Sequence, residues 1–78
     1  MKKKLLNILN YLLDNNNKDK LIVLDEMLSL REDLEFDSFD LAELAVRLED
    51  EFNVDVFESG IVHTVDDIIK KLNQGEIK

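Results

Sequence analysis

Apolar residues at helical spacing in the middle of the chain constrain the fold most strongly. These residues, which would fall on one face of a helix with 3.6 residues per turn, are Leu41, Leu44, Ala45, Leu48 and Phe52. Most of the positions between them carry carboxylates. We therefore predict an amphipathic helix from about Ser38 to Glu51, with its apolar face in a core and an acidic face in water.

Two further segments have the same periodicity. The first contains Leu5, Ile8, Leu9 and Leu12, and the polar run at residues 14–17 is expected to end it, because short polar side chains compete for backbone hydrogen bonds. The second contains Val65, Ile68, Ile69 and Leu72. It is preceded by Thr64 and Asp67 at the spacing of a capping box, so we predict that the last helix starts at Thr64. Leu9, Leu44, Leu48 and Ile68 are expected to be buried together.

The connections complete the predicted fold. Residues 18–37 form a long first loop, in which the apolar residues 21–24, Met27, Leu28, Leu30 and Leu34 are expected to pack on the core. Residues 57–62 can form one short helical turn. The fold class is therefore all-α, a small four-helix bundle of three main helices plus one short helix. We expect one domain over residues 1–78, with a core at about 3–73 and a frayed tail at 74–78.

Composition narrows the possible functions. With 18 acidic and 10 basic residues, the net charge is −8, which argues against nucleic-acid binding and favours partners with basic surfaces. The chain has no cysteine, so disulfides and cysteine nucleophiles are excluded, and a reducing cytoplasm fits. No apolar run approaches the roughly 20 residues of a membrane span, and no signal peptide is expected.

Catalytic and metal sites find little support in the sequence. A triad of Ser38, His63 and an aspartate can be written down, but there is one histidine and no Gly-x-Ser-x-Gly elbow. A calcium loop from Asp14 is also rejected, because Lys18 cannot ligate a cation and Asp19 stands where the turn glycine is needed. We predict that the protein is not an enzyme and holds no metal.

Ser38 stands where the main helix is expected to begin, and its hydroxyl suits an N-cap. Around it, residues 29–44 (SLREDLEFDSFDLAEL) and 48–52 (LEDEF) resemble the acyl carrier protein family. The resemblance extends from the first helix to the last. It implies that Ser38 carries covalent 4'-phosphopantetheine, whose thiol holds acyl groups as thioesters. It further implies that the protein works with a phosphopantetheinyl transferase and with acyl-transfer or synthase enzymes. The acidic balance favours a fatty-acid-type carrier over a peptidyl carrier, so we expect a monomer that acts in fatty acid biosynthesis.

The resemblance also assigns roles to residues near Ser38. Asp37, in the flanking motif, and Asp40 would contact the transferase or its metal, although Asp40 could instead complement the helix dipole. The expected partner-binding residues are Phe39, Asp40, Glu43, Val46, Glu49 and Asp50. Phe39 replaces the usual leucine and is expected either beside the arm or partly buried on the first loop. Glu35-Phe36 stands where members often have glycine.

Two alternatives to a fatty-acid carrier stay open at this point. One is a carrier for a specialised pathway, such as polyketide, aminoacyl or other acyl transfer. The other is an unmodified helical adaptor module, in which Ser38 only caps its helix.

Overall fold

Three helices make up the regular structure of the chain. The computed structural model describes residues 2–57 and 62–77, with side chains of the last helix as far as residue 73. The helices are α1 (Lys2–Asn15), α2 (Ser38–Phe52) and α3 (Val65–Ile77). The described residues contain no strand, and one isolated antiparallel bridge joins Ser29 to Thr64. The all-α prediction is confirmed, whereas the short fourth helix predicted at residues 57–62 lies largely outside the described residues.

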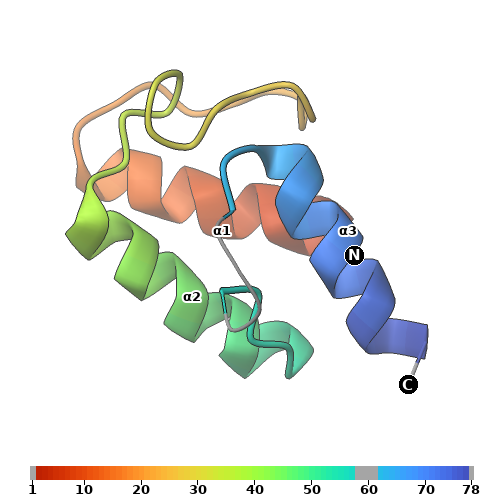
Figure 1. The fold of residues 1–78 in the computed structure, drawn as a ribbon. Helices are drawn as coiled ribbons and strands as arrows, with labels where there is room; N and C mark the ends of the chain where they lie inside the picture. Colours follow the sequence, from red (N-terminus) through yellow and green to blue (C-terminus); the bar gives the residue numbers. More distant parts are fainter. Residues whose placement is uncertain (1, 58–61, 78) are drawn as a thin grey trace.

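The apolar stripes of the helices meet in one core. Figure 1 shows α1 and α2 running side by side in opposite directions, with α3 beside them. Leu9, Leu44, Leu48 and Ile68 are each fully buried in the same cluster, as predicted. Burial of these apolar faces, rather than helix propensity, supplies most of the stability of such short helices. None of the helices in the described ranges is long and apolar enough to cross a bilayer.

The helix ends differ slightly from the predicted ones. α2 extends one residue past Glu51, to Phe52. Asn53 is its C-cap, with a left-handed backbone and an N–H that donates to the carbonyl of Glu49. α3 continues to Ile77, so its backbone is helical within the predicted tail at residues 74–78. The division into a core of residues 3–73 and a tail stays a prediction.

The long first loop is fixed by hydrogen bonds to α1 and by others within the loop. The Asn10 side chain accepts from the backbone N–H of Leu21 at 2.7 Å and donates to its carbonyl at 3.0 Å. Lys18 donates to the carbonyls of Leu34 and Glu35 at 3.1 and 2.9 Å. The loop therefore has a defined path over α1 to the start of α2 (Figure 1).

The prediction that all apolar residues of this loop pack on the core is wrong in part. Leu30 and Leu34 are buried, and Leu28 is partly buried against the core. Ile22, Val23 and Met27, by contrast, are 93%, 69% and 83% exposed. The segment is anchored by Leu21, Leu24 and Leu28, which are partly buried against the core, and the apolar residues between these anchors face the solvent.

Candidate functional site

The start of α2 is closed by two aspartates, and the prediction that Ser38 is the N-cap is wrong. Asp37 is the N-cap, and its carboxylate accepts from the Asp40 N–H at 2.8 Å. The Asp40 carboxylate accepts in return from the Asp37 N–H at 3.1 Å, which completes a capping box. A carboxylate caps as well as a hydroxyl does. Ser38 is thereby released from capping and becomes the first helical residue.

The capping bonds also favour the ionised form of Asp37. The N–H donated by Asp40 lowers the pKa of Asp37 below its ordinary value. Because folding lowers this pKa, the ionised carboxylate stabilises the fold fully when the pH is above the ordinary pKa of an aspartate. This stabilisation is lost as the pH falls through the lowered pKa of Asp37. At neutral pH the cap is therefore ionised.

The Ser38 side chain is exposed at this helix end. Its hydroxyl oxygen accepts a long hydrogen bond from Nη2 of Arg31, at 3.5 Å. Arg31 belongs to the first loop, where it follows buried Leu30 and lies inside the turn that the N–H groups of Asp33 and Leu34 close on the Ser29 carbonyl. An exposed nucleophilic oxygen thus lies beside a cation at a helix N-terminus, where the helix dipole favours negative charge.

An apolar hollow of about 430 Å³ opens next to Ser38. Its described apolar lining comes from α2 and from the segments that flank residues 58–61, and consists of Leu41, Ala42, Ala45, Phe57 and Val62. Arg31, Ser38 and His63 supply the polar part. The small side chains of Ala42 and Ala45 leave the room, so a group attached at Ser38 has an apolar space within reach.

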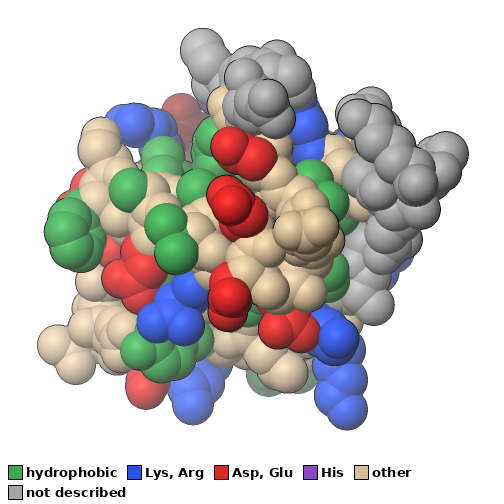
Figure 2. Space-filling model, turned by 90° about the horizontal axis from the view of Figure 1, so that it is seen from below, with side chains coloured by type: hydrophobic (Ala, Val, Ile, Leu, Met, Phe, Trp, Pro, Cys, Tyr) green, Lys and Arg blue, Asp and Glu red, His purple; other side chains and the backbone are tan. Residues whose placement is uncertain are grey.

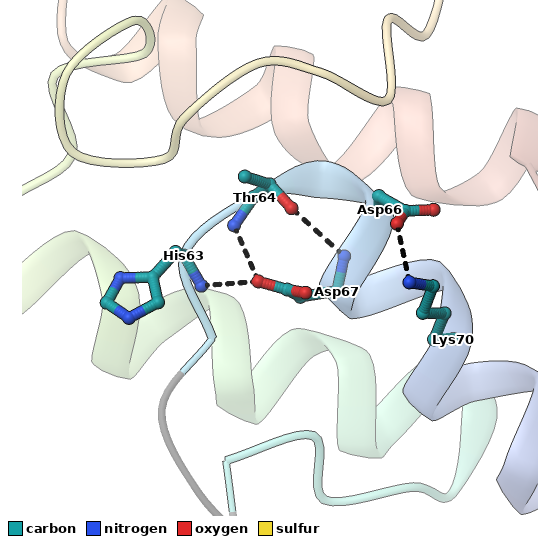
Figure 3. A network of polar contacts seen from close by, with 5 residues as sticks. All are labelled: His63, Thr64, Asp66, Asp67 and Lys70. Atoms are coloured by element: carbon teal, nitrogen blue, oxygen red, sulfur yellow. Dashed lines mark hydrogen bonds and ion pairs between the residues drawn. The ribbon is translucent and has the colours of Figure 1, made fainter.

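The start of α3 positions His63 at this hollow. The Thr64 hydroxyl accepts from the Asp67 N–H at 3.2 Å, and the Asp67 carboxylate accepts from the N–H groups of Thr64 and His63 at 3.1 and 3.0 Å (Figure 3). These donors, that of His63 first, lower the pKa of Asp67. The predicted capping box is confirmed. The Asp67 carboxylate bonds to the backbone of His63, and the imidazole ring points away from it (Figure 3).

The predicted partner-binding residues separate into two groups. Asp40 and Glu43 are engaged within the fold: Asp40 accepts from the Asn16 side chain at 3.1 Å, and Glu43 pairs with Arg47 at 3.0 Å. Arg47 also stacks on the Tyr11 ring of α1, 3.9 Å from its centroid. The dipole-complementing role of Asp40 is thus supported by its place in the cap.

The second group faces outward. Phe39 is 78% exposed and Val46 is 67% exposed, so Phe39 is not partly buried on the first loop. Glu49 and Asp50 are exposed and form no ion pair with any described residue. Figure 2, which views the molecule from the α2 side, shows acidic side chains across the middle and hydrophobic ones toward one end. These four residues are available to a partner.

Sequence reasoning missed Arg31 and gave His63 no role at the site. Nothing in the sequence spacing places either one beside Ser38, because both arrive through the bridge between the first loop and α3. That bridge joins the Leu30 N–H to the His63 carbonyl at 2.8 Å. The Asp37–Asp40 spacing, on the other hand, is a capping-box pattern and could have identified the correct N-cap.

Glu35, in the loop that leads into this site, has a left-handed backbone conformation. It is not a glycine, yet its φ is 57°, a left-handed conformation that costs an ordinary residue roughly 1–2 kcal/mol. We expect Glu35→Gly to raise the free energy of unfolding by about 0.5–1 kcal/mol, after the entropy that glycine adds to the unfolded chain is subtracted. Urea denaturation measures this change. Glu35→Gln removes the charge but keeps the Cβ atom, so an equal gain from that variant would refute the conformational explanation.

A small helical domain with an exposed serine at a helix start and an adjoining apolar hollow has the features of a carrier domain. The family model described as phosphopantetheine attachment site matches residues 4–72. That match covers most of the chain, and the protein belongs to this family of acyl carrier domains. Comparison of the chain with curated proteins and with solved structures gives no match.

Membership of the family establishes the cofactor, which is covalently bound 4'-phosphopantetheine. The protein is thus a phosphopantetheine-carrying carrier, and such domains work with transferases and acyl-transfer enzymes and are generally not catalytic themselves. The start of α2 fits the group, because it offers an exposed hydroxyl with an apolar hollow beside it.

Proposed function

We propose that Ser38 carries the 4'-phosphopantetheine and that the protein transports acyl groups as thioesters in fatty acid biosynthesis. The observation that carries this proposal is the exposed Ser38 hydroxyl at the N-terminus of α2, at the edge of the apolar hollow. The bound group supplies a thiol, which a chain without cysteine cannot provide.

The residues around Ser38 have separable tasks in this proposal. Asp37 and Asp40 cap α2 and so hold the first helical turn in which Ser38 lies. The α2 N-terminus tolerates the negative charge of a phosphodiester at the serine. Leu41, Ala45 and Val62 offer apolar surface to the cargo, which favours an aliphatic acyl chain over a polar aminoacyl group. A chain without cysteine fits the reducing cytoplasm, where we expect the protein to act as a monomer.

Incubation with coenzyme A and a phosphopantetheinyl transferase tests the proposal. The intact mass of the protein should rise by one phosphopantetheine. The adaptor alternative, in which Ser38 is never modified, predicts an unchanged mass under conditions in which a known carrier is converted.

The outward residues of α2 support a proposed docking surface for enzymes with basic patches, formed by Phe39, Val46, Glu49 and Asp50. Exposed charges act mainly on the encounter rate and are screened beyond a Debye length of about 8 Å at physiological salt. We expect Glu49→Lys and Asp50→Lys each to weaken binding to a cognate transferase by roughly 3–10-fold. Binding of the wild type should also weaken with added salt. Surface plasmon resonance at several salt concentrations measures both effects.

Asp19→Lys is the matched control, because it changes the net charge equally at a loop position off α2. Glu43→Lys is less suitable, since it would break the ion pair with Arg47. If Asp19→Lys weakens binding as much as Asp50→Lys does, only the total charge matters and this surface is not the docking site. Binding that ignores charge and salt would instead place recognition on Phe39 and Val46.

A further inference from the structure

Arg31 lies close enough to Ser38 to act on whatever is attached there. Its Nη2 atom is 3.5 Å from the Ser38 hydroxyl oxygen, and both residues line the same hollow. Arg31 comes from a loop seven positions earlier in the chain. The contact is therefore a product of the tertiary fold and not of helix geometry.

The backbone around Arg31 is held firmly. The Leu30 N–H donates to the carbonyl of His63 at 2.8 Å, and the Leu30 carbonyl accepts from the Phe36 N–H at 2.9 Å. The Ser29 hydroxyl accepts from the Glu32 N–H at 3.2 Å, which closes the turn on the other side. Because Leu30 is fully buried, the position of the Arg31 backbone relative to α2 is fixed, and only its exposed side chain is left to adjust.

The charge of Arg31 is not used elsewhere in the described structure. Acidic residues are close to it in the chain, at Glu32, Asp33 and Glu35, yet Arg31 forms no ion pair with any described residue. The other nearby cation, Lys18, donates instead to two backbone carbonyls. A phosphodiester on Ser38 would add negative charge next to the ionised Asp37, so a neighbouring cation has a clear use there.

We propose that Arg31 is the phosphate-binding residue of the arm, pairing its guanidinium with the phosphodiester on Ser38. This inference rests on the proposed attachment at Ser38. A guanidinium suits the task, because its planar set of donors can bond two phosphate oxygens at once, which the single ammonium of lysine cannot match. Holding the phosphate end would direct the remainder of the arm along the hollow that Arg31 also lines. Arg31 is thus a positioning residue for the arm.

The arginine side-chain resonances provide the first test. The chain has two arginines, Arg31 and Arg47, and Arg47 is already held by Glu43 and Tyr11. In the nitrogen-15 spectrum, conversion of the apo to the holo protein should shift the Nε–H signal of Arg31 and leave that of Arg47 unchanged. Arg31→Lys, which removes one signal, assigns them. An Arg31 signal that does not move on conversion overturns the inference.

The second test compares the thermal midpoints of apo and holo protein for the wild type, Arg31→Gln and Arg31→Lys. Lys3→Gln is the control, because it changes the charge equally on the exposed first turn of α1, at the other end of the molecule from Ser38 (Figure 1). For each protein we compare the shift of the thermal midpoint when apo is converted to holo. We expect this shift to be about 2–5 °C lower in Arg31→Gln than in the wild type or Lys3→Gln. Arg31→Lys should be intermediate.

The two proposals can fail separately. If the mass of the wild type never rises with transferase and coenzyme A, attachment at Ser38 fails and the inference falls with it. If the holo form is obtained but Arg31→Gln and Lys3→Gln respond alike, attachment stands and Arg31 has no role in holding the phosphate.

Discussion

Leu48→Ala should lower the free energy of unfolding by about 2–5 kcal/mol. Leu48 is fully buried at the centre of the α2 stripe, in one cluster with Leu9 and Ile68. Truncation removes apolar surface from a cluster to which all three helices contribute, and it leaves a cavity that the neighbours can fill only in part. For a small domain with a total stability of about 5–15 kcal/mol, this is a large share. Urea denaturation followed by far-UV circular dichroism measures the change.

Val46→Ala is the matched control for this substitution. Val46 is two residues away on the same helix but is 67% exposed, so we expect a change within about 0.5 kcal/mol. If the two variants lose similar stability, the face of α2 assigned to the core is wrong. An equal urea midpoint for Leu48→Ala and the wild type would lead to the same conclusion.

Ser38→Ala should abolish attachment of phosphopantetheine altogether. The proposal places the new phosphodiester bond at the Ser38 oxygen, and alanine has no oxygen to offer. The fold should survive, because Asp37 and Asp40, and not Ser38, close the start of α2. The intact mass after incubation with transferase and coenzyme A measures the loss, and circular dichroism checks that the variant is folded.

Ser29→Ala serves as the control for the loss of a serine hydroxyl. The Ser29 hydroxyl accepts from the Glu32 N–H within its own turn, so its removal alters the loop but leaves Ser38 intact. We expect Ser29→Ala to be modified and Ser38→Ala to keep the apo mass. A rise in the mass of Ser38→Ala would show that Ser38 is not the residue to which phosphopantetheine is attached.

Helical periodicity predicted the helices and the centre of the core, because each buried position depends on its neighbours within a single helix. Leu9, Leu44, Leu48 and Ile68 are all fully buried. The Thr64–Asp67 spacing likewise predicted the capping box of α3, because its hydrogen bonds join residues only three positions apart.

The path of the first loop could not be predicted from the sequence, because it depends on contacts with residues far away in the chain. Met27 and Leu28 are adjacent apolar residues, yet one is exposed and the other packs on the core. What separates them is the pairing of the loop with Asn10 and with the start of α3. The same pairing brings Arg31 next to Ser38, so this part of the candidate site was visible only in three dimensions.

Fragmentation of the modified protein identifies the residue that carries the phosphopantetheine. The protein is converted with transferase and coenzyme A, digested, and the peptide with added mass is sequenced by tandem mass spectrometry. We expect the phosphopantetheine to lie on Ser38, between fragments that end at Asp37 and Phe39. Added mass on any other residue would contradict it.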